Sequence, residues 1–123
     1  MAKKKVFISF DFDNDLDLKN LLVGQSKLAD SPFEIADYSL KEAAPEKDWE
    51  EKALAKIKRS EIVVVIAGPE THSASGVKKE VKMANDNNIK VVQIKPNGST
   101  NKRVEYAGVL YNWTWENLKS ILS

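Results

Sequence analysis

The chain has 123 residues with 19 basic side chains, 18 acidic side chains and no cysteine. This length predicts a single domain over residues 1–123, and the lack of cysteine excludes disulfides, thiolate zinc sites and cysteine nucleophiles. The balanced charge argues against nucleic acid as a partner, and the sequence has neither a membrane-span pattern nor a signal-peptide pattern, so we expect a cytoplasmic protein that does not bind membranes.

The N-terminal part predicts a strand followed by a helix. Residues 6–10 (VFISF) form a short apolar run that is typical of a buried strand. After an acidic stretch, either Asp13 or Asn14 is expected to cap a helix. The apolar stripe of this helix is predicted from residues at helical spacing: Leu18, Leu21, Leu22, Gln25 and Ala29.

The middle of the chain predicts two more strands with a helix between them. Residues 33–37 (FEIAD) are a candidate strand, and the polar residues 38–47 are expected to form a loop. Asp48 is a candidate N-cap for the next helix because Glu51 follows three residues later. Residues 62–67 (IVVVIA) are continuously apolar, which indicates a strand buried on both faces of a parallel sheet.

The C-terminal part continues the same alternation. A helix is predicted from about 75 to 87, followed by a strand at 90–94 (KVVQI). After a polar loop, residues 108–113 are a candidate fifth strand, and Thr114 is expected to cap a last helix.

This alternation predicts a three-layer α/β fold of the flavodoxin-like, doubly wound type. The expected sheet is parallel, with five strands in the order 2-1-3-4-5. In such sheets, ligands bind beyond the carboxyl ends of the strands where the strand order reverses. The two loops expected at that point are 11–15 and 68–75.

The loop after the first strand carries acids that could bind Mg²⁺, because hard cations prefer carboxylate oxygen. Asp11 and Asp13 would be the ligands of a receiver-like or phosphatase-like module, and Lys95-Pro96 fits a receiver pattern loosely. The alternative is that these acids only cap the helix and complement its dipole. Nucleotide loops of the GxG or P-loop type are absent. A lone histidine, His72, makes a zinc site improbable, so we predict no bound metal.

Glu80 borders the apolar stripe of the 75–87 helix and has no salt-bridge partner at helical spacing. A carboxylate beside an apolar face and near the expected crevice could be partly desolvated, which would raise its pKa and suit it to acid–base work or to binding a ribose hydroxyl. The alternative is a solvated glutamate at the edge of a helix.

Several segments together resemble the TIR-like (Toll/interleukin-1 receptor-like) family, in the branch that includes bacterial Thoeris antiphage proteins. The resemblance runs over nearly the whole chain and rests on these segments: KKVFISF at 4–10, FEIADYSL at 33–40, IVVVIAGPET at 62–71, VKKEVKMA at 77–84, IKPNG at 94–98 and NWTWENLKSI at 112–121.

The resemblance implies an NAD⁺-processing enzyme of antiphage signalling, either a glycohydrolase or a protein that forms ADP-ribose signals. NAD⁺ would be its substrate, with no permanently bound cofactor. Glu80 matches the family's catalytic glutamate. The candidates for contacting the nucleotide are Ser9, Phe10, Asp11, Asp13, Tyr38, Ser39, Thr71, His72, Ser73 and Ser75.

Other interpretations stay open beside the enzyme. Gly76 stands where the family has a tryptophan, four residues before the glutamate, which favours a non-catalytic TIR-like interaction module. Expected partners are NAD⁺ or a related nucleotide, further copies of the chain through TIR–TIR contacts, and a separate effector protein.

Overall fold

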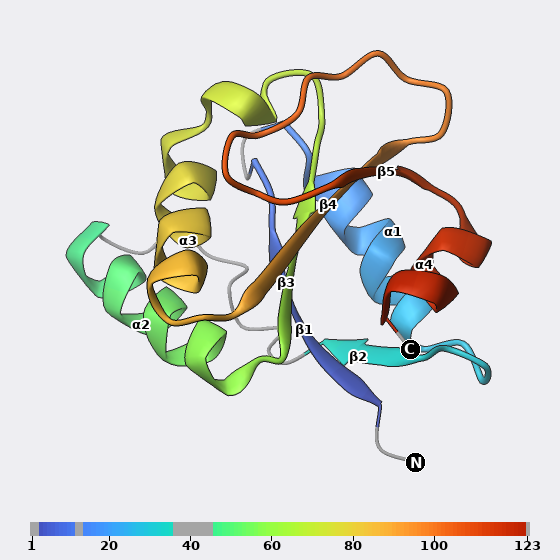
Figure 1. Ribbon diagram of the computed structural model, residues 1–123, viewed down its shortest axis with the longest axis horizontal. Coiled ribbons are helices and arrows are strands. Elements are labelled where there is room, and N and C mark those ends of the chain that lie inside the picture. Colours follow the sequence, from blue (N-terminus) through green and yellow to red (C-terminus); the bar gives the residue numbers. More distant parts are fainter. Residues whose placement is uncertain (1–2, 12–13, 36–45, 123) are drawn as a thin grey trace.

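The computed structural model describes residues 3–11, 14–35 and 46–122, with the side chains of 46–49 left out. It contains a five-stranded parallel sheet of order β2-β1-β3-β4-β5, which confirms the predicted order and the α/β class. Helices α1 and α4 cover one face of the sheet, and α2 and α3 cover the other (Figure 1).

The observed elements follow the predicted succession. The strands are β1 (Lys4–Ser9), β2 (Phe33–Ile35), β3 (Ile62–Ile66), β4 (Lys90–Pro96) and β5 (Leu110–Trp113). The helices are α1 (Leu16–Ser26), α2 (Glu46–Arg59), the 3₁₀ turn η1 (Thr71–Ser73), α3 (Ser75–Asp86) and α4 (Trp115–Leu122).

Strand β3 lies at the centre of the sheet and separates two apolar cores. All five of its side chains are buried, as its continuous apolar run predicts. Val64 and Ile66 face the core under α1 and α4, which includes Leu22 and Leu118. Val63 and Val65 face the core under α2 and α3. The alternation of side chains along the strand therefore supplies both layers.

The predicted buried face of α1 is partly wrong. The helix buries Lys19, Leu22 and Ser26, whereas Leu21 is 56% exposed. The helix also ends at Ser26, so Ala29 lies beyond it. Apolar residues occur on more than one side of this helix, and their spacing alone does not determine which side meets the sheet.

Three predicted helix caps have different outcomes. Thr114 caps α4, since its Oγ1 accepts the backbone N–H of Asn117 at 3.1 Å. Asp48 is not the N-cap of α2, because the helix already begins at Glu46. The N-cap of α1 is Asp15 rather than Asp13 or Asn14, and its side chain makes no capping bond.

The long connection from β4 to β5, residues 97–109, is fixed to the sheet by Gln93. This fully buried side chain donates to the carbonyls of Val104 and Gly108 and accepts the backbone N–H of Val104 at 2.7 Å. Gly108 has a φ of 77°, and a Cβ there would overlap the carbonyl of Val91. The connection is therefore an ordered wall at the edge of the molecule.

Candidate functional site

Ser9 and Glu80 form a buried pair where β1 ends against α3. The hydroxyl of Ser9 donates to Glu80 Oε1 at 2.6 Å. Ser9 is fully buried and Glu80 is 6% exposed. The alternation along β1 directs Phe7 and Ser9 toward α3, and helical spacing places Glu80 on the buried stripe with Val77 and Val81.

Burial changes the acidity of this carboxyl. Loss of hydration raises the pKa of Glu80 from 4.5 to about 8, and the hydrogen bond from Ser9 opposes that rise. The carboxyl is therefore mostly protonated at neutral pH. A positive charge brought next to it would favour the ionised form.

A second buried contact joins the two loops expected to form the site. The hydroxyl of Thr71 donates to Asp15 Oδ2 at 2.8 Å, and it accepts the backbone N–H of Gly68 at 2.8 Å. Burial raises the pKa of Asp15, the bond from Thr71 opposes this, and the charge of Asp11 adds to it. This contact ties the start of α1 to the end of β3.

The other predicted binding residues are scattered around this centre. Phe10 packs against the core under α1 and α4, on the opposite face of the sheet from Glu80. Asp11 accepts a hydrogen bond from Asn14 at 2.7 Å. Ser73 is exposed and bonds the carbonyl of Glu70. Ser75 is the exposed first residue of α3.

His72 lines a cleft between α3 and the 97–109 connection, and Glu80 is not among the residues that line this cleft. The structure thus brings Ser9 to Glu80, and Thr71 to the same edge of the sheet, but it places Phe10 and His72 elsewhere. Asp13, Tyr38 and Ser39 lie outside the described residues. Their predicted contacts with a nucleotide stay predictions, as do those of the other candidates.

The acids of the described part of the chain do not gather into a metal centre. No group of three or more His, Asp or Glu side chains suited to a metal ion occurs within residues 3–11, 14–35 and 46–122. Asp15, the acid nearest to Thr71, is engaged in the buried hydrogen bond described above.

Two residues that organise the site do not stand out in the sequence. Asp15 is one acid among several in its loop, and Gly68 simply follows an apolar strand. A Cβ at position 68 would overlap the carboxylate of Asp15, so a larger residue there would have to displace that side chain. A glycine directly after a buried strand is the only sequence signal of this close approach.

The helices of the described residues are too short or too polar to span a membrane. None of them is both long and apolar enough to cross a bilayer.

Comparisons with known proteins agree with this fold. The chain matches the structure of a conserved protein from Enterococcus faecalis V583 with a TM-score of 0.69 and 15% identity, over 98% of each chain. Comparison with curated proteins gives no match. The family model described as "Thoeris protein ThsB, TIR-like domain" matches residues 7–101, a segment that contains Ser9, Asp15, Thr71 and Glu80. The chain therefore belongs to the Thoeris ThsB TIR-like family.

Proposed function

We propose that this Thoeris-type antiphage TIR-like protein processes NAD⁺ and that Glu80 is its catalytic carboxylate. The observation that carries the proposal is the buried Ser9–Glu80 pair at the carboxyl end of β1, with the pKa of Glu80 raised to about 8. Perturbed carboxyls at such positions are characteristic of functional sites.

In the proposed reaction, the bond between nicotinamide and C1′ of the ribose breaks. The electron pair leaves with nicotinamide, which loses its ring charge, and positive charge develops on the ribose. Water or a hydroxyl group then adds to C1′ and releases a proton. An ionised Glu80 beside the ribose would stabilise the developing charge, and the buried surroundings would strengthen that attraction.

Ser9 has a positioning role in this proposal. Its hydrogen bond holds one carboxylate oxygen and leaves the other for ribose hydroxyls. The same bond favours the ionised form of Glu80 and so limits the rise of its pKa. The positive ring of NAD⁺ would act in the same direction on binding.

The test compares nicotinamide release by the wild type, Glu80→Gln and Glu61→Gln. Glu61 is an exposed glutamate just before β3, far along the sheet from Glu80, and serves as the matched control. Each protein is incubated with NAD⁺, alone and with lysate from phage-infected cells. We expect Glu80→Gln to lose at least about 100-fold in rate and Glu61→Gln to match the wild type. Equal products from wild type and Glu80→Gln would contradict the catalytic role.

A non-catalytic TIR-like interaction module is the second candidate. Two observations favour it. Glu80 already has a hydrogen-bond partner inside the protein, and Gly76 stands four residues before it, where the TIR-like family that the sequence resembles has a tryptophan. This candidate predicts concentration-dependent self-association in sedimentation velocity, together with no NAD⁺ binding in calorimetry. NAD⁺ binding that Glu80→Gln weakens would instead exclude it.

A further inference from the structure

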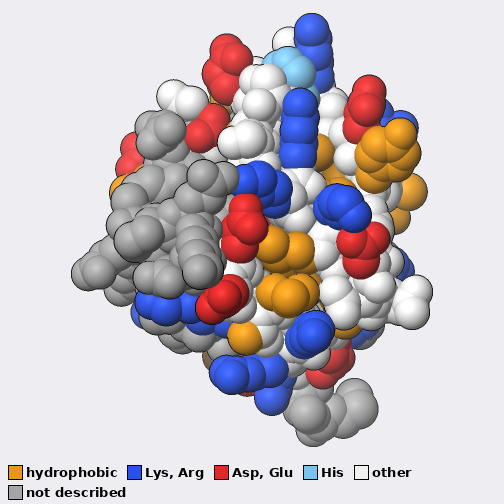
Figure 2. All heavy atoms as spheres, turned by 90° about the vertical axis from the view of Figure 1, so that its left-hand side faces the viewer, with side chains coloured by type: hydrophobic (Ala, Val, Ile, Leu, Met, Phe, Trp, Pro, Cys, Tyr) orange, Lys and Arg blue, Asp and Glu red, His pale blue; other side chains and the backbone are white. Residues whose placement is uncertain are grey.

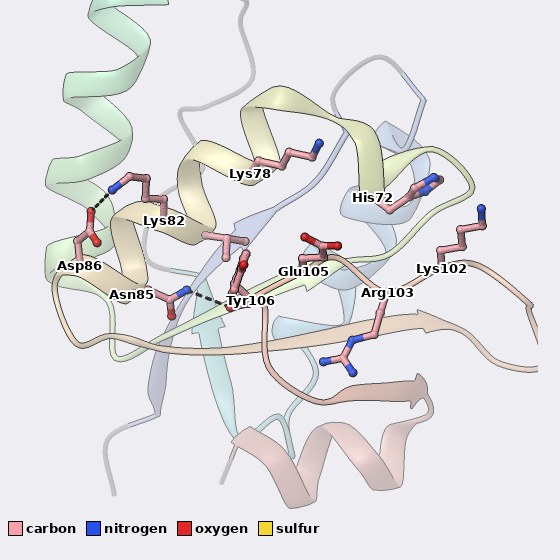
Figure 3. Close-up of a pocket in the computed structure, with 10 residues that line it drawn as sticks. His72, Lys78, Lys82, Asn85, Asp86, Lys102, Arg103, Glu105 and Tyr106 are labelled. Atoms are coloured by element: carbon pink, nitrogen blue, oxygen red, sulfur yellow. Dashed lines mark hydrogen bonds and ion pairs between the residues drawn. The ribbon is translucent and has the colours of Figure 1, made fainter.

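A cleft of about 980 Å³ lies between α3 and the 97–109 connection (Figure 3). Its described lining includes neither Glu80 nor Ser9, so it is separate from the candidate catalytic pair. The cleft has the volume of a site for a small organic ligand. The lining residues are His72, Lys78, Val81, Lys82, Asn85, Asp86, Lys102, Arg103, Glu105 and Tyr106.

Positive charge predominates in this cleft. Lys82 pairs with Asp86 at 2.8 Å, and the guanidinium of Arg103 donates to the carbonyl of Gly108. Lys78 and Lys102 have no ion-pair partner among the residues that the structure describes, and they come from α3 and from the 97–109 connection, the two walls of the cleft (Figure 3). Figure 2 shows lysine and arginine side chains around apolar ones on this side of the molecule, with acidic side chains among them.

An exposed aromatic side chain stands at the edge of the cleft. Tyr106 is 81% exposed, yet its backbone has a φ of 64°, which is costly for a bulky residue. Asn85 on α3 donates to the carbonyl of Tyr106 at 3.0 Å across the cleft. Backbone strain of this kind persists where the surroundings hold it, and it is concentrated at functional sites.

The wall that carries Tyr106 is held to the sheet by hydrogen bonds. Gln93 fixes the backbone of the 97–109 connection at Val104 and Gly108. Asn101 donates to the carbonyl of Ala67 at 2.9 Å, which ties the same connection to the end of β3. A preformed wall lowers the entropy cost of binding a ligand.

We propose that this cleft binds a nucleoside phosphate at a second site, separate from Glu80. Lys78 and Lys102 would bind the phosphate oxygens from the two walls, and Tyr106 would stack on the base. The carboxylate of Glu105 points into the opening (Figure 3), where it would accept hydrogen bonds from ribose hydroxyls. This acid favours a nucleoside phosphate over a bare anion, which it would repel.

The test titrates ADP into the full-length protein by calorimetry, with backbone amide shifts recorded in parallel. We expect the double variant Lys78→Gln/Lys102→Gln to bind ADP at least about tenfold more weakly. The matched control is Lys58→Gln/Lys90→Gln, which removes the same charge from two exposed lysines outside the cleft. The control and Glu80→Gln should both bind ADP as the wild type does.

Two further titrants identify the groups that the cleft recognises. Inorganic pyrophosphate and adenosine should each bind more weakly than ADP, and Tyr106→Ala should reduce affinity for ADP more than for pyrophosphate. The proposal is overturned if ADP does not bind, if the control double variant loses as much affinity as the cleft variant, or if ADP shifts the amides around Ser9 rather than those of 102–106. Loss of catalysis in Glu80→Gln with ADP binding intact would separate the two sites.

Discussion

At the scale of single residues, the carboxyl of Glu80 occupies a place where its charge is disfavoured. Its side chain is nearly buried, and it accepts a hydrogen bond from Ser9. An apolar residue of similar size would fit the stripe formed by Val77, Val81 and Ala84 at less cost. Because burying this carboxyl costs free energy, its presence indicates a role in function rather than in packing.

This cost predicts how stability depends on pH. Because the pKa of Glu80 is about 8 in the folded protein and 4.5 ordinarily, the folded state binds the proton more tightly. The stability that the folded protein gains from a protonated Glu80 is fully present below pH 4.5, and it is lost as pH rises through 8. Glu80→Gln should therefore be more stable than the wild type at pH 8.5, by on the order of a few kcal/mol, with little gain at pH 4.5. Urea unfolding at both pH values measures this, and an equal gain at both would contradict it.

The bond from Ser9 predicts a shift in the pH dependence of activity. If ionised Glu80 is the active form, kcat/KM for NAD⁺ rises with pH and levels off above about 8. Ser9→Ala removes a bond that lowers the pKa of Glu80, so the rise should move to higher pH. The control Ser120→Ala changes an exposed serine on α4, on the opposite face of the sheet from Glu80. A purely structural role for Ser9 would reduce the rate without moving the profile.

At the scale of elements, the contact between Asp15 and Thr71 joins the β1–α1 and β3–α3 connections. The sequence could place both connections at one edge of the sheet, because parallel strands end together there. Helical spacing could place Glu80 at the border of the apolar stripe of α3, but it could not decide between a buried and a solvated carboxyl. The sequence could not identify Asp15 as the acid that turns inward, since neighbouring acids differ only in three-dimensional contacts. The exposed Leu21 shows the same limit for α1.

The close approach at Gly68 gives a prediction with an internal control. Gly68→Ala forces its Cβ into the carboxylate of Asp15 and should destabilise the protein by about 1–3 kcal/mol. Gly24 lies inside α1, and no atom lies within 4 Å of the place that an alanine methyl group would occupy there. Gly24→Ala should therefore stabilise by about 0.5–1 kcal/mol. Chemical denaturation measures the free energy of unfolding of both variants. An unchanged value for Gly68→Ala would show that the side chain of Asp15 can move aside without cost.

At the scale of the whole molecule, the sheet separates two chemically different sides. The core under α1 and α4 includes the large side chains of Phe33, Trp113 and Leu122. The other side carries Glu80 on the buried stripe of α3 and the cationic cleft between α3 and the 97–109 connection. The βα alternation predicts the two sides, but not the cleft. Lys78 and Lys102 come from distant segments of the chain, and Gln93 and Asn101 hold the 97–109 connection that carries Lys102.

Gln93 therefore predicts a local opening that is distinct from global unfolding. Gln93→Leu keeps the side-chain size but leaves the N–H of Val104 and the carbonyls of Val104 and Gly108 without this partner. We expect a loss of stability on the order of a few kcal/mol. Because β3 lies in the middle of the sheet, its amides should still exchange only with global unfolding, while the amide of Val104 exchanges much faster. Asn117→Ala, which removes one exposed bond to Asn112, should leave Val104 protected. Hydrogen exchange that accelerates equally in β3 and at Val104 would mean that the connection is no separate unit, and the preformed wall of the cleft would lose its basis.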